Sequence, residues 1–164
     1  MKHSLCLAFV LTAAWFSGGC ATSKPKDYTP VTARFFLESS TTSDGTPLML
    51  PQSGVRMTVN PKPVITEGDI INVELVQVDL GKALLVQLSP SASRDFYRLS
   101  VTHQGRRLVF LVAGNPIGAR RIDGPIINGV VYVFIEIPEP DMPAFVENLK
   151  KSSVAMQREL ARKG

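Results

Sequence analysis

The chain has 164 residues, with 18 basic and 14 acidic side chains and a formal net charge of +4. This length suits one domain behind an export signal, and the mild positive charge is too small to argue for nucleic acid as a partner. The two cysteines, Cys6 and Cys20, do not make a disulfide framework, because Cys6 lies in the segment expected to be removed.

The N-terminal segment 1–19 has the organisation of an export signal. Lys2 and His3 precede an apolar run at 5–16, and three small residues lead into Cys20. The run is shorter than the roughly 20 residues that a membrane-spanning helix needs. A cysteine directly after small residues resembles a bacterial lipoprotein signal. We therefore predict cleavage before Cys20 and acylation of its thiol, for example with palmitate.

Cleavage of an ordinary secretory signal is the alternative. Lipoprotein signals usually carry Leu or Val three residues before the cysteine, where this chain has Ser17. Ser17 and Gly19 also satisfy the small-x-small rule, so a signal peptidase could cut before Cys20 or after Ala21. If Cys20 is acylated, Ala21 behind it resembles the pattern of lipoproteins sent to the outer membrane of a Gram-negative cell. The expected location is the cell envelope, with the domain facing the periplasm.

The rest of the chain divides into a flexible tether at 20–33 and one domain at 34–164. The tether contains Pro25 and Pro30, several hydroxyl residues and little apolar content, which is typical of a solvated linker. No later apolar run is long enough to span a bilayer, because the stretch 130–137 has the length of a strand.

Strand patterns and turn signals alternate through the first half of the domain. An apolar strand is expected at 34–38, a long Ser/Thr/Gly/Pro-rich loop at 39–54, and a half-buried strand at 55–59. Pro61 and Pro63 should end that strand, because proline cannot donate to a sheet ladder.

The next segment predicts a β-hairpin followed by a helix. Its strands are expected at 72–79 and 83–88, with Gly81 in the reversal between them. Ser89-Pro90 suits a helix start, since serine caps the first turn and proline fits its first position. Gly105 is the expected end of this helix.

Three strands and a helix complete the domain. Strands are expected at 107–112 and 117–122, with the reversal at 114–116, and 130–137 predicts a buried central strand because five of its eight residues are β-branched. Asp141 can begin a final helix whose last residues are polar and basic. Its apolar side is expected to carry Met142, Phe145, Leu149, Met156 and Leu160. Together the elements predict an α+β fold, a mainly antiparallel sheet with helices packed on one face.

Four sequence segments occur in the same order as the corresponding segments of a known protein family. They are the helix start at 89–96, the strand at 106–112 with its turn at 114–117, the proline and glycine turn at 124–129 and the closing helix at 140–149. From about residue 64 to 149 the chain resembles the periplasmic domain of the SecD/SecF protein-export membrane proteins. The resemblance implies a SecD-like fold and a surface that meets extended or unfolded polypeptide.

The chain departs from this family in what drives export. SecD and SecF belong to the accessory complex of an export channel, powered by proton movement through transmembrane helices, and this sequence has no comparable segments. We therefore expect a non-enzymatic binding or accessory protein without a motor of its own, whose partner is a protein, unfolded polypeptide or another envelope component. A small envelope glycan hydrolase and a purely structural lipoprotein are the alternatives, and the oligomeric state is left open.

Residues that could carry chemistry are sparse. His103 is expected at a helix end without a carboxylate partner, and Ser93 and Ser100 lie in no nucleophile motif. One histidine and one cysteine behind the signal are too few for a zinc site. No catalytic residue, metal site or cofactor is predicted.

Four arginines form the most suggestive cluster of charge: Arg106, Arg107, Arg120 and Arg121. The two pairs flank neighbouring predicted strands, so they could lie together on one sheet edge. Such a patch could bind anionic headgroups, cell-wall polymer or acidic protein. The alternative is that arginines at strand ends are solvated and discourage edge-to-edge aggregation.

Overall fold

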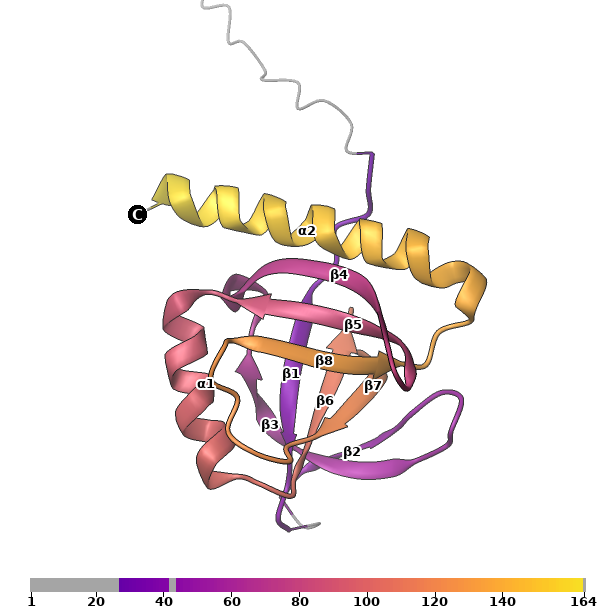
Figure 1. Ribbon diagram of the computed structural model, residues 1–164, viewed down its shortest axis with the longest axis vertical. Coiled ribbons are helices and arrows are strands. Elements are labelled where there is room, and N and C mark those ends of the chain that lie inside the picture. The colour runs from indigo at the N-terminus through magenta and orange to yellow at the C-terminus, as the bar shows by residue number, and fades with distance from the viewer. Residues whose placement is uncertain (1–26, 42–43, 164) are drawn as a thin grey trace, which may run out of the picture.

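The computed structural model describes residues 27–41 and 44–163 (Figure 1). The predicted signal, Cys20 and the first part of the tether lie outside the described residues. In chain order the elements are β1 (Ala33–Glu38), β2 (Thr46–Met49), β3 (Arg56–Ile65), the 3-10 helix η1 (Glu67–Asp69), β4 (Ile70–Val78), β5 (Gly81–Leu88), α1 (Pro90–Thr102), β6 (Arg107–Val112), β7 (Asn115–Arg121), β8 (Val130–Ile135), the 3-10 helix η2 (Glu139–Asp141) and α2 (Met142–Lys163).

The strands form one antiparallel sheet in the order β2-β3-β1-β6-β7-β8-β5-β4. The sheet bends so strongly that β4, β5 and β8 cross in front of β1 and β6 (Figure 1). The predicted hairpin is confirmed, because Gln77 pairs with Lys82 and Val78 with Gly81 across its turn. Gly81 has φ +121, a conformation that L side chains rarely adopt.

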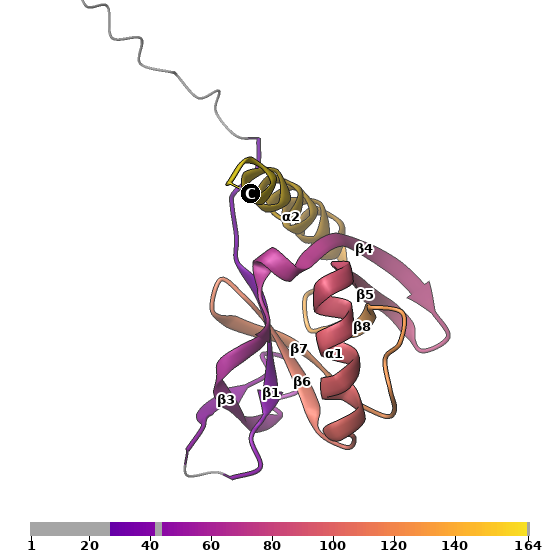
Figure 2. The same ribbon diagram turned by 90° about the vertical axis from the view of Figure 1, so that its left-hand side faces the viewer.

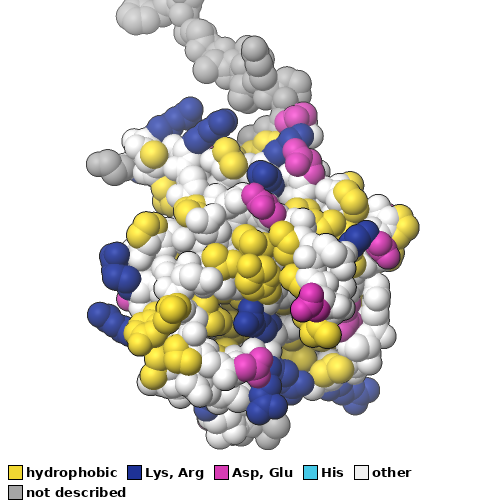
Figure 3. Space-filling view, viewed as in Figure 1, with side chains coloured by type: hydrophobic (Ala, Val, Ile, Leu, Met, Phe, Trp, Pro, Cys, Tyr) yellow, Lys and Arg dark blue, Asp and Glu magenta, His cyan; other side chains and the backbone are white. Residues whose placement is uncertain are grey.

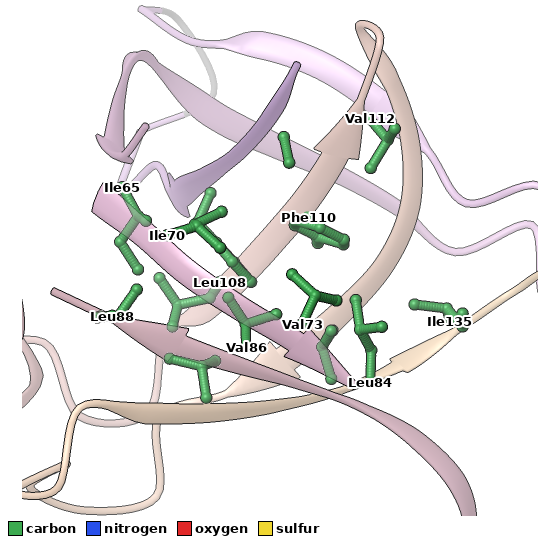
Figure 4. Close-up of a cluster of buried hydrophobic side chains, with 14 of the residues drawn as sticks. Ile65, Ile70, Val73, Leu84, Val86, Leu88, Leu108, Phe110, Val112 and Ile135 are labelled. Carbon is green, nitrogen blue, oxygen red and sulfur yellow. The ribbon is translucent and has the colours of Figure 1, made fainter. Parts of the chain in front are cut away.

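The main core lies between these two layers of the bent sheet. Leu84 and Val86 of β5 point toward Leu108 and Phe110 of β6 (Figure 4). The rings of Phe35 and Phe110 stack with their centroids 4.5 Å apart. Burying such side chains fully contributes roughly 1.5–3 kcal/mol each, so this cluster dominates the stability of the fold.

A smaller core covers the opposite face of β6. Val109 and Leu111 pack there against Met57 and Val59 of β3 and against Leu50. The turn after Leu50 is held by Glu136 at the end of β8, which accepts hydrogen bonds from the backbone N–H groups of Gln52 (2.8 Å) and Ser53 (2.9 Å).

Both helices contribute to the main core, which confirms the predicted α+β class. Ser89 caps α1 as predicted, accepting a hydrogen bond from the N–H of Ala92 at 3.3 Å, and α1 inserts Phe96 into the core. The C-terminal helix α2 packs along β4 and inserts Val146 and Leu149. Figures 1 and 2 show α2 lying across one end of the molecule and α1 along its side.

Two predictions around β3 are wrong. The strand β3 continues through Pro61 and Pro63 to Ile65, because β2 pairs only with its first four residues, Arg56–Val59. On the β2 side the prolines have no neighbouring strand. On the other side β3 pairs with β1, and the register shifts on both sides of the Phe36–Pro63 pair, so the prolines lie at an irregular part of this ladder, where proline is tolerated. The segment 39–54, expected to be a loop, contains the edge strand β2.

Four further expectations differ in detail. The strand β8 is not buried on both faces, since Tyr132 is 38% and Phe134 42% exposed. Helix α1 is capped by His103, and Gly105 beyond it donates its N–H to the carbonyl of Ile122. Helix α2 continues to Lys163, and Leu160, expected on its apolar side, is 44% exposed. The reversal before β7 falls at 113–114, because β7 already begins at Asn115.

Candidate functional site

The four predicted arginines lie around one end of the β6–β7 hairpin. Arg107 stands opposite Arg121 and Leu108 opposite Arg120 in the register of the two strands. The two pairs are thus brought together, as predicted. They do not lie on a sheet edge, because β6 and β7 are inner strands, so protection against edge pairing does not explain them.

One of these arginines is committed to a structural ion pair. The N–H and Nε of Arg107 each donate to Glu38 at 3.0 Å, and Nη2 makes a further contact with the same carboxylate. The hydrogen bond from Arg107 holds the pKa of Glu38 below its usual range, and attraction to Arg106 adds a smaller effect in the same direction. This pair joins the ends of β1 and β6.

Two other arginines of the cluster have longer polar contacts. Arg120 donates from Nη1 to the carbonyl of Tyr132 at 3.3 Å, and the Nε of Arg121 lies 3.8 Å from Asp123. The Arg121 side chain is 69% exposed. Arg121 is therefore the member of the cluster best placed to meet a charged partner.

A pocket of about 430 Å³ lies between α1 and the loop that joins β7 to β8. We call it the α1 pocket; it is lined by Ser93, Arg94, Tyr97, Arg98 and Ile127. Ile127 is 78% and Tyr97 43% exposed, whereas the side chains of the core are nearly inaccessible. Figure 3 shows hydrophobic side chains gathered at the lower left, over α1 and its neighbouring loop, with basic side chains beside them.

Two contacts fix the loop that carries Ile127. The buried hydroxyl of Ser100 donates to the carbonyl of Tyr97 at 2.8 Å and accepts from the N–H of Ile126 at 2.9 Å. At the far end of the loop, a Cβ added to Gly129 would lie 2.5 Å from Ser93 Oγ, and Gly129 has φ +64. Helix and loop therefore approach so closely that only glycine fits, and Ile127 is presented on a fixed backbone.

The serine and histidine side chains have structural roles. Both hydrogen-bonding capacities of the Ser100 hydroxyl are used between helix and loop, and Ser93 packs on Gly129. His103 caps α1, with Nδ1 3.0 Å from the carbonyl of Leu99 and 2.8 Å from Thr102 Oγ1. Within residues 27–41 and 44–163, no group of three or more His, Cys, Asp or Glu side chains could hold a metal ion.

Hydrogen bonds stabilise the charged form of several carboxyl groups. Hydrogen bonds from partner side chains lower the pKa of Asp27, Glu67 and Glu139. Burial pushes the pKa of Glu136 upward, but hydrogen bonds from Ser53 and Gln52 outweigh it and leave the pKa below its usual value. A carboxylic acid that protonates a leaving group at neutral pH needs a raised pKa. Every resolved carboxyl shift in the described part of the chain has the opposite direction.

The α1 pocket could not be found from the sequence. Tyr97 and Arg98 read as ordinary residues of an amphipathic helix, and Ile127 reads as part of a turn between proline and glycine. The available signal was the pair Ile126-Ile127 in a segment of turn formers, 124–129, because only one of two adjacent side chains can easily face the core; Ile126 is buried there and Ile127 is exposed.

These features define an α+β domain, built on a bent antiparallel sheet, with an open apolar pocket rimmed by arginines. No helix in the described ranges is long and apolar enough to cross a membrane. No protein-family model matches the chain, and neither does any curated protein.

Solved structures of SecDF share this fold. One, described as a membrane component that enhances protein export, has a TM-score of 0.54 at 15% identity and covers 78% of this chain and 62% of its own. A super-membrane-facing form has a TM-score of 0.54 at 15% identity, with 77% of this chain and 18% of that chain covered.

A third, a translocon-associated membrane protein from Thermus thermophilus, has a TM-score of 0.52 at 14% identity over 77% of this chain and 20% of that chain. The chain thus spans less than two thirds of each SecDF chain. At these identities the likeness shows the fold alone, which is SecD-like as the sequence resemblance implied.

Proposed function

We propose that this protein is a non-enzymatic binding or accessory module of the cell envelope, anchored by acylation of Cys20, that meets extended polypeptide through the α1 pocket. The fold shared with SecDF, whose structures are described as enhancing protein export and as translocon-associated, supports this reading. The organisation of residues 1–20 as a lipoprotein-like signal supports the anchor.

The observation that carries the proposal is the exposed Ile127 on a fixed loop. Ile127 is 78% exposed, so a partner that covers it lowers the free energy of the complex by removing apolar surface from water. The loop is held by Ser100 at Ile126 and by the close approach of Gly129 to Ser93, which limits the entropy lost on binding. Tyr97 adds an aromatic contact beside it.

The charge around the pocket favours a particular kind of polypeptide. Arg94 and Arg98 line it, and Arg98 is paired only loosely, with Asp95 at 3.8 Å and both side chains 80% exposed. A segment with apolar residues for Ile127 and Tyr97 and carboxylates for the two arginines fits this surface. An extended or unfolded segment offers such side chains together, whereas folded proteins bury most of their isoleucine, leucine and valine.

Peptide binding tests the pocket. The piece 21–164 contains every described contact, so it can be purified without the signal. We expect it to bind a fluorescent peptide of alternating leucine and glutamate, and not a matched peptide with serine in place of leucine, as measured by anisotropy. Ile127→Asp should weaken binding about tenfold or more, because the apolar contact is lost.

Leu80→Asp is the matched control. Leu80 is 84% exposed in the turn between β4 and β5, so the same substitution there changes charge and surface hydrophobicity equally, away from the pocket. Equal binding by the wild type and the Ile127→Asp variant, or an equal loss in the Leu80→Asp variant, would contradict binding at the α1 pocket.

The anchor needs its own measurement. Mass spectrometry of the mature protein from membrane fractions should find Cys20 at the N-terminus with fatty acyl groups attached. Cys20→Ser should move the protein out of the membrane fraction. A chain that keeps Met1, or one that begins with an unmodified residue, would contradict the anchor.

A further inference from the structure

We propose that the exposed face of α2 is a docking surface for anionic phospholipid headgroups, which orients the domain on the membrane to which it is anchored. This inference rests on the proposed function in one respect, the lipid at Cys20. Its physical basis lies in how the N-terminal segment meets α2.

The first described residues are bound to α2 rather than free. Asn148 clamps the backbone of Thr29, accepting its N–H and donating to its carbonyl, both at 2.8 Å. The N–H of Val31 donates to Ser152 Oγ at 3.2 Å, and Lys151 pairs with Asp27 at 2.8 Å. The expected tether is therefore held against α2 from Asp27 onward, and the indigo segment passes beside this helix in Figures 1 and 2.

This attachment places the lipid close to α2. Seven Cα steps separate Cys20 from Asp27, which is at most about 25 Å of fully extended chain. Asp27 and Tyr28 line one surface pocket together with Lys150, Lys151 and Arg158. A bilayer that holds the lipid is therefore within reach of the basic side chains of α2.

The composition of α2 suits such a surface. Lys151, Arg158 and Arg162 follow spacings of seven and four, which place them on one side of the helix, opposite the buried Leu149. Lys151 is paired with Asp27 and lies 3.8 Å from Glu147 on the same side, so the charge available for docking comes from Arg158 and Arg162, which are exposed. The other acidic residue of the helix is Glu159. The five basic residues of α2 are Lys150, Lys151, Arg158, Arg162 and Lys163.

Two side chains of α2 fix the rotation of the helix about its own axis. Near the N-terminal end, Asn148 binds the incoming chain, and farther along Gln157 Nε2 donates to the carbonyls of Gly68 and Ile70, each at 3.0 Å. The helix therefore cannot roll without breaking these bonds, and its basic side keeps one direction. Helix α1 runs along the flank of the molecule, whereas α2 lies across one end (Figure 1). With the basic side of α2 on the membrane, the α1 pocket would therefore stay uncovered.

Vesicle binding tests the inference without the lipid. The piece 21–164 should sediment with vesicles of phosphatidylglycerol and phosphatidylcholine at low salt, and much less with pure phosphatidylcholine. Raising the salt should weaken the binding, because it screens exposed charges. Arg158→Gln with Arg162→Gln should weaken binding roughly tenfold or more, given the contribution of each basic residue near an anionic surface.

Arg56→Gln with Lys62→Gln is the matched control, because it removes two exposed positive charges from β3. We expect this variant to bind nearly as well as the wild type. Circular dichroism and thermal unfolding check that both variants fold.

Equal losses in the two double variants would overturn the inference in favour of net charge alone. No binding to anionic vesicles at low salt would also overturn it. Neither result bears on the α1 pocket, which is measured with peptides, or on Cys20, which is measured by mass spectrometry, so the failure of each proposal can be told apart.

Discussion

The two helices fold against the same core but present different surfaces. Helix α1 buries Phe96 and shows Tyr97 and two arginines beside the loop, whereas α2 buries Val146 and Leu149 and shows a mostly basic side. Helix α1 binds the β7–β8 loop through Ser100, and α2 binds the N-terminal segment. In each helix the buried residues fix the direction in which the exposed side chains face. One domain can thereby carry the α1 pocket, with its two arginines, and the basic side of α2 at separate places.

The largest expected effects test whether both helices belong to one cooperative unit. Phe96→Ala should lower the free energy of unfolding by about 4 kcal/mol and Leu149→Ala by about 3 kcal/mol, because each leaves a cavity in the shared core. Chemical denaturation, followed by circular dichroism, measures both. The controls are Val101→Ala and Leu160→Ala, whose side chains are 43% and 44% exposed.

The view that both helices share one core would be contradicted if Phe96→Ala and Leu149→Ala changed unfolding in different ways. A Leu149→Ala change of less than about 1 kcal/mol, or a separate transition for α2, would make that helix a peripheral attachment. The basic side of α2 would then have no fixed direction relative to the α1 pocket.

A smaller effect is expected at the link between α1 and its loop. Ser100→Ala removes the acceptor of the Ile126 N–H and should cost about 2 kcal/mol, because a buried donor is left unpaired. It should also weaken peptide binding through Ile127, since the loop loses its fixed backbone. Thr102→Ala, which removes an exposed hydroxyl of the same helix, should stay within about 0.5 kcal/mol of wild type. Equal stability of the two variants would show that the loop is held elsewhere.

Features that depend on neighbouring residues could be predicted from the sequence. The hairpin around Gly81, the cap at Ser89 and the strand 107–112 follow from local periodicity and turn chemistry, and the structure has them. The antiparallel class followed from the number of such hairpins. A family resemblance based on the same local signals also identified the SecD-like fold.

Features that depend on distant residues could not be predicted. The continuation of β3 through Pro61 and Pro63 depends on where β2 ends along it and on the shifted register of its pairing with β1, and nothing in the local sequence gives either. The exposure of Ile127 depends on how closely Gly129 approaches Ser93. Likewise, the partner of Arg107 is Glu38, 69 residues earlier in the chain. Sequence spacing placed the arginines together but could not say which one is neutralised.

The smallest effect concerns the clamp between α2 and the N-terminal segment. Asn148→Ala removes both hydrogen bonds to Thr29 and should cost about 1 kcal/mol, because they are exposed to solvent. Hydrogen exchange of the Thr29 and Val31 amides should accelerate, whereas exchange in β5 should not change. Asn148→Asp keeps the acceptor for the Thr29 N–H but loses the donor, so an intermediate acceleration is expected.

The clamp should also depend on pH in one direction. The hydrogen bond and charge of Lys151 lower the pKa of Asp27, so the ion pair is complete above the usual pKa of aspartate, about 3.9, and is lost as the pH falls through the lowered value. Exchange at Thr29 should therefore accelerate in acid after correction for the intrinsic rate. Unchanged protection in both the Asn148→Ala variant and acid would mean that the segment is held by contacts other than these. The orientation of the domain relative to its N-terminal lipid would then not be set by α2.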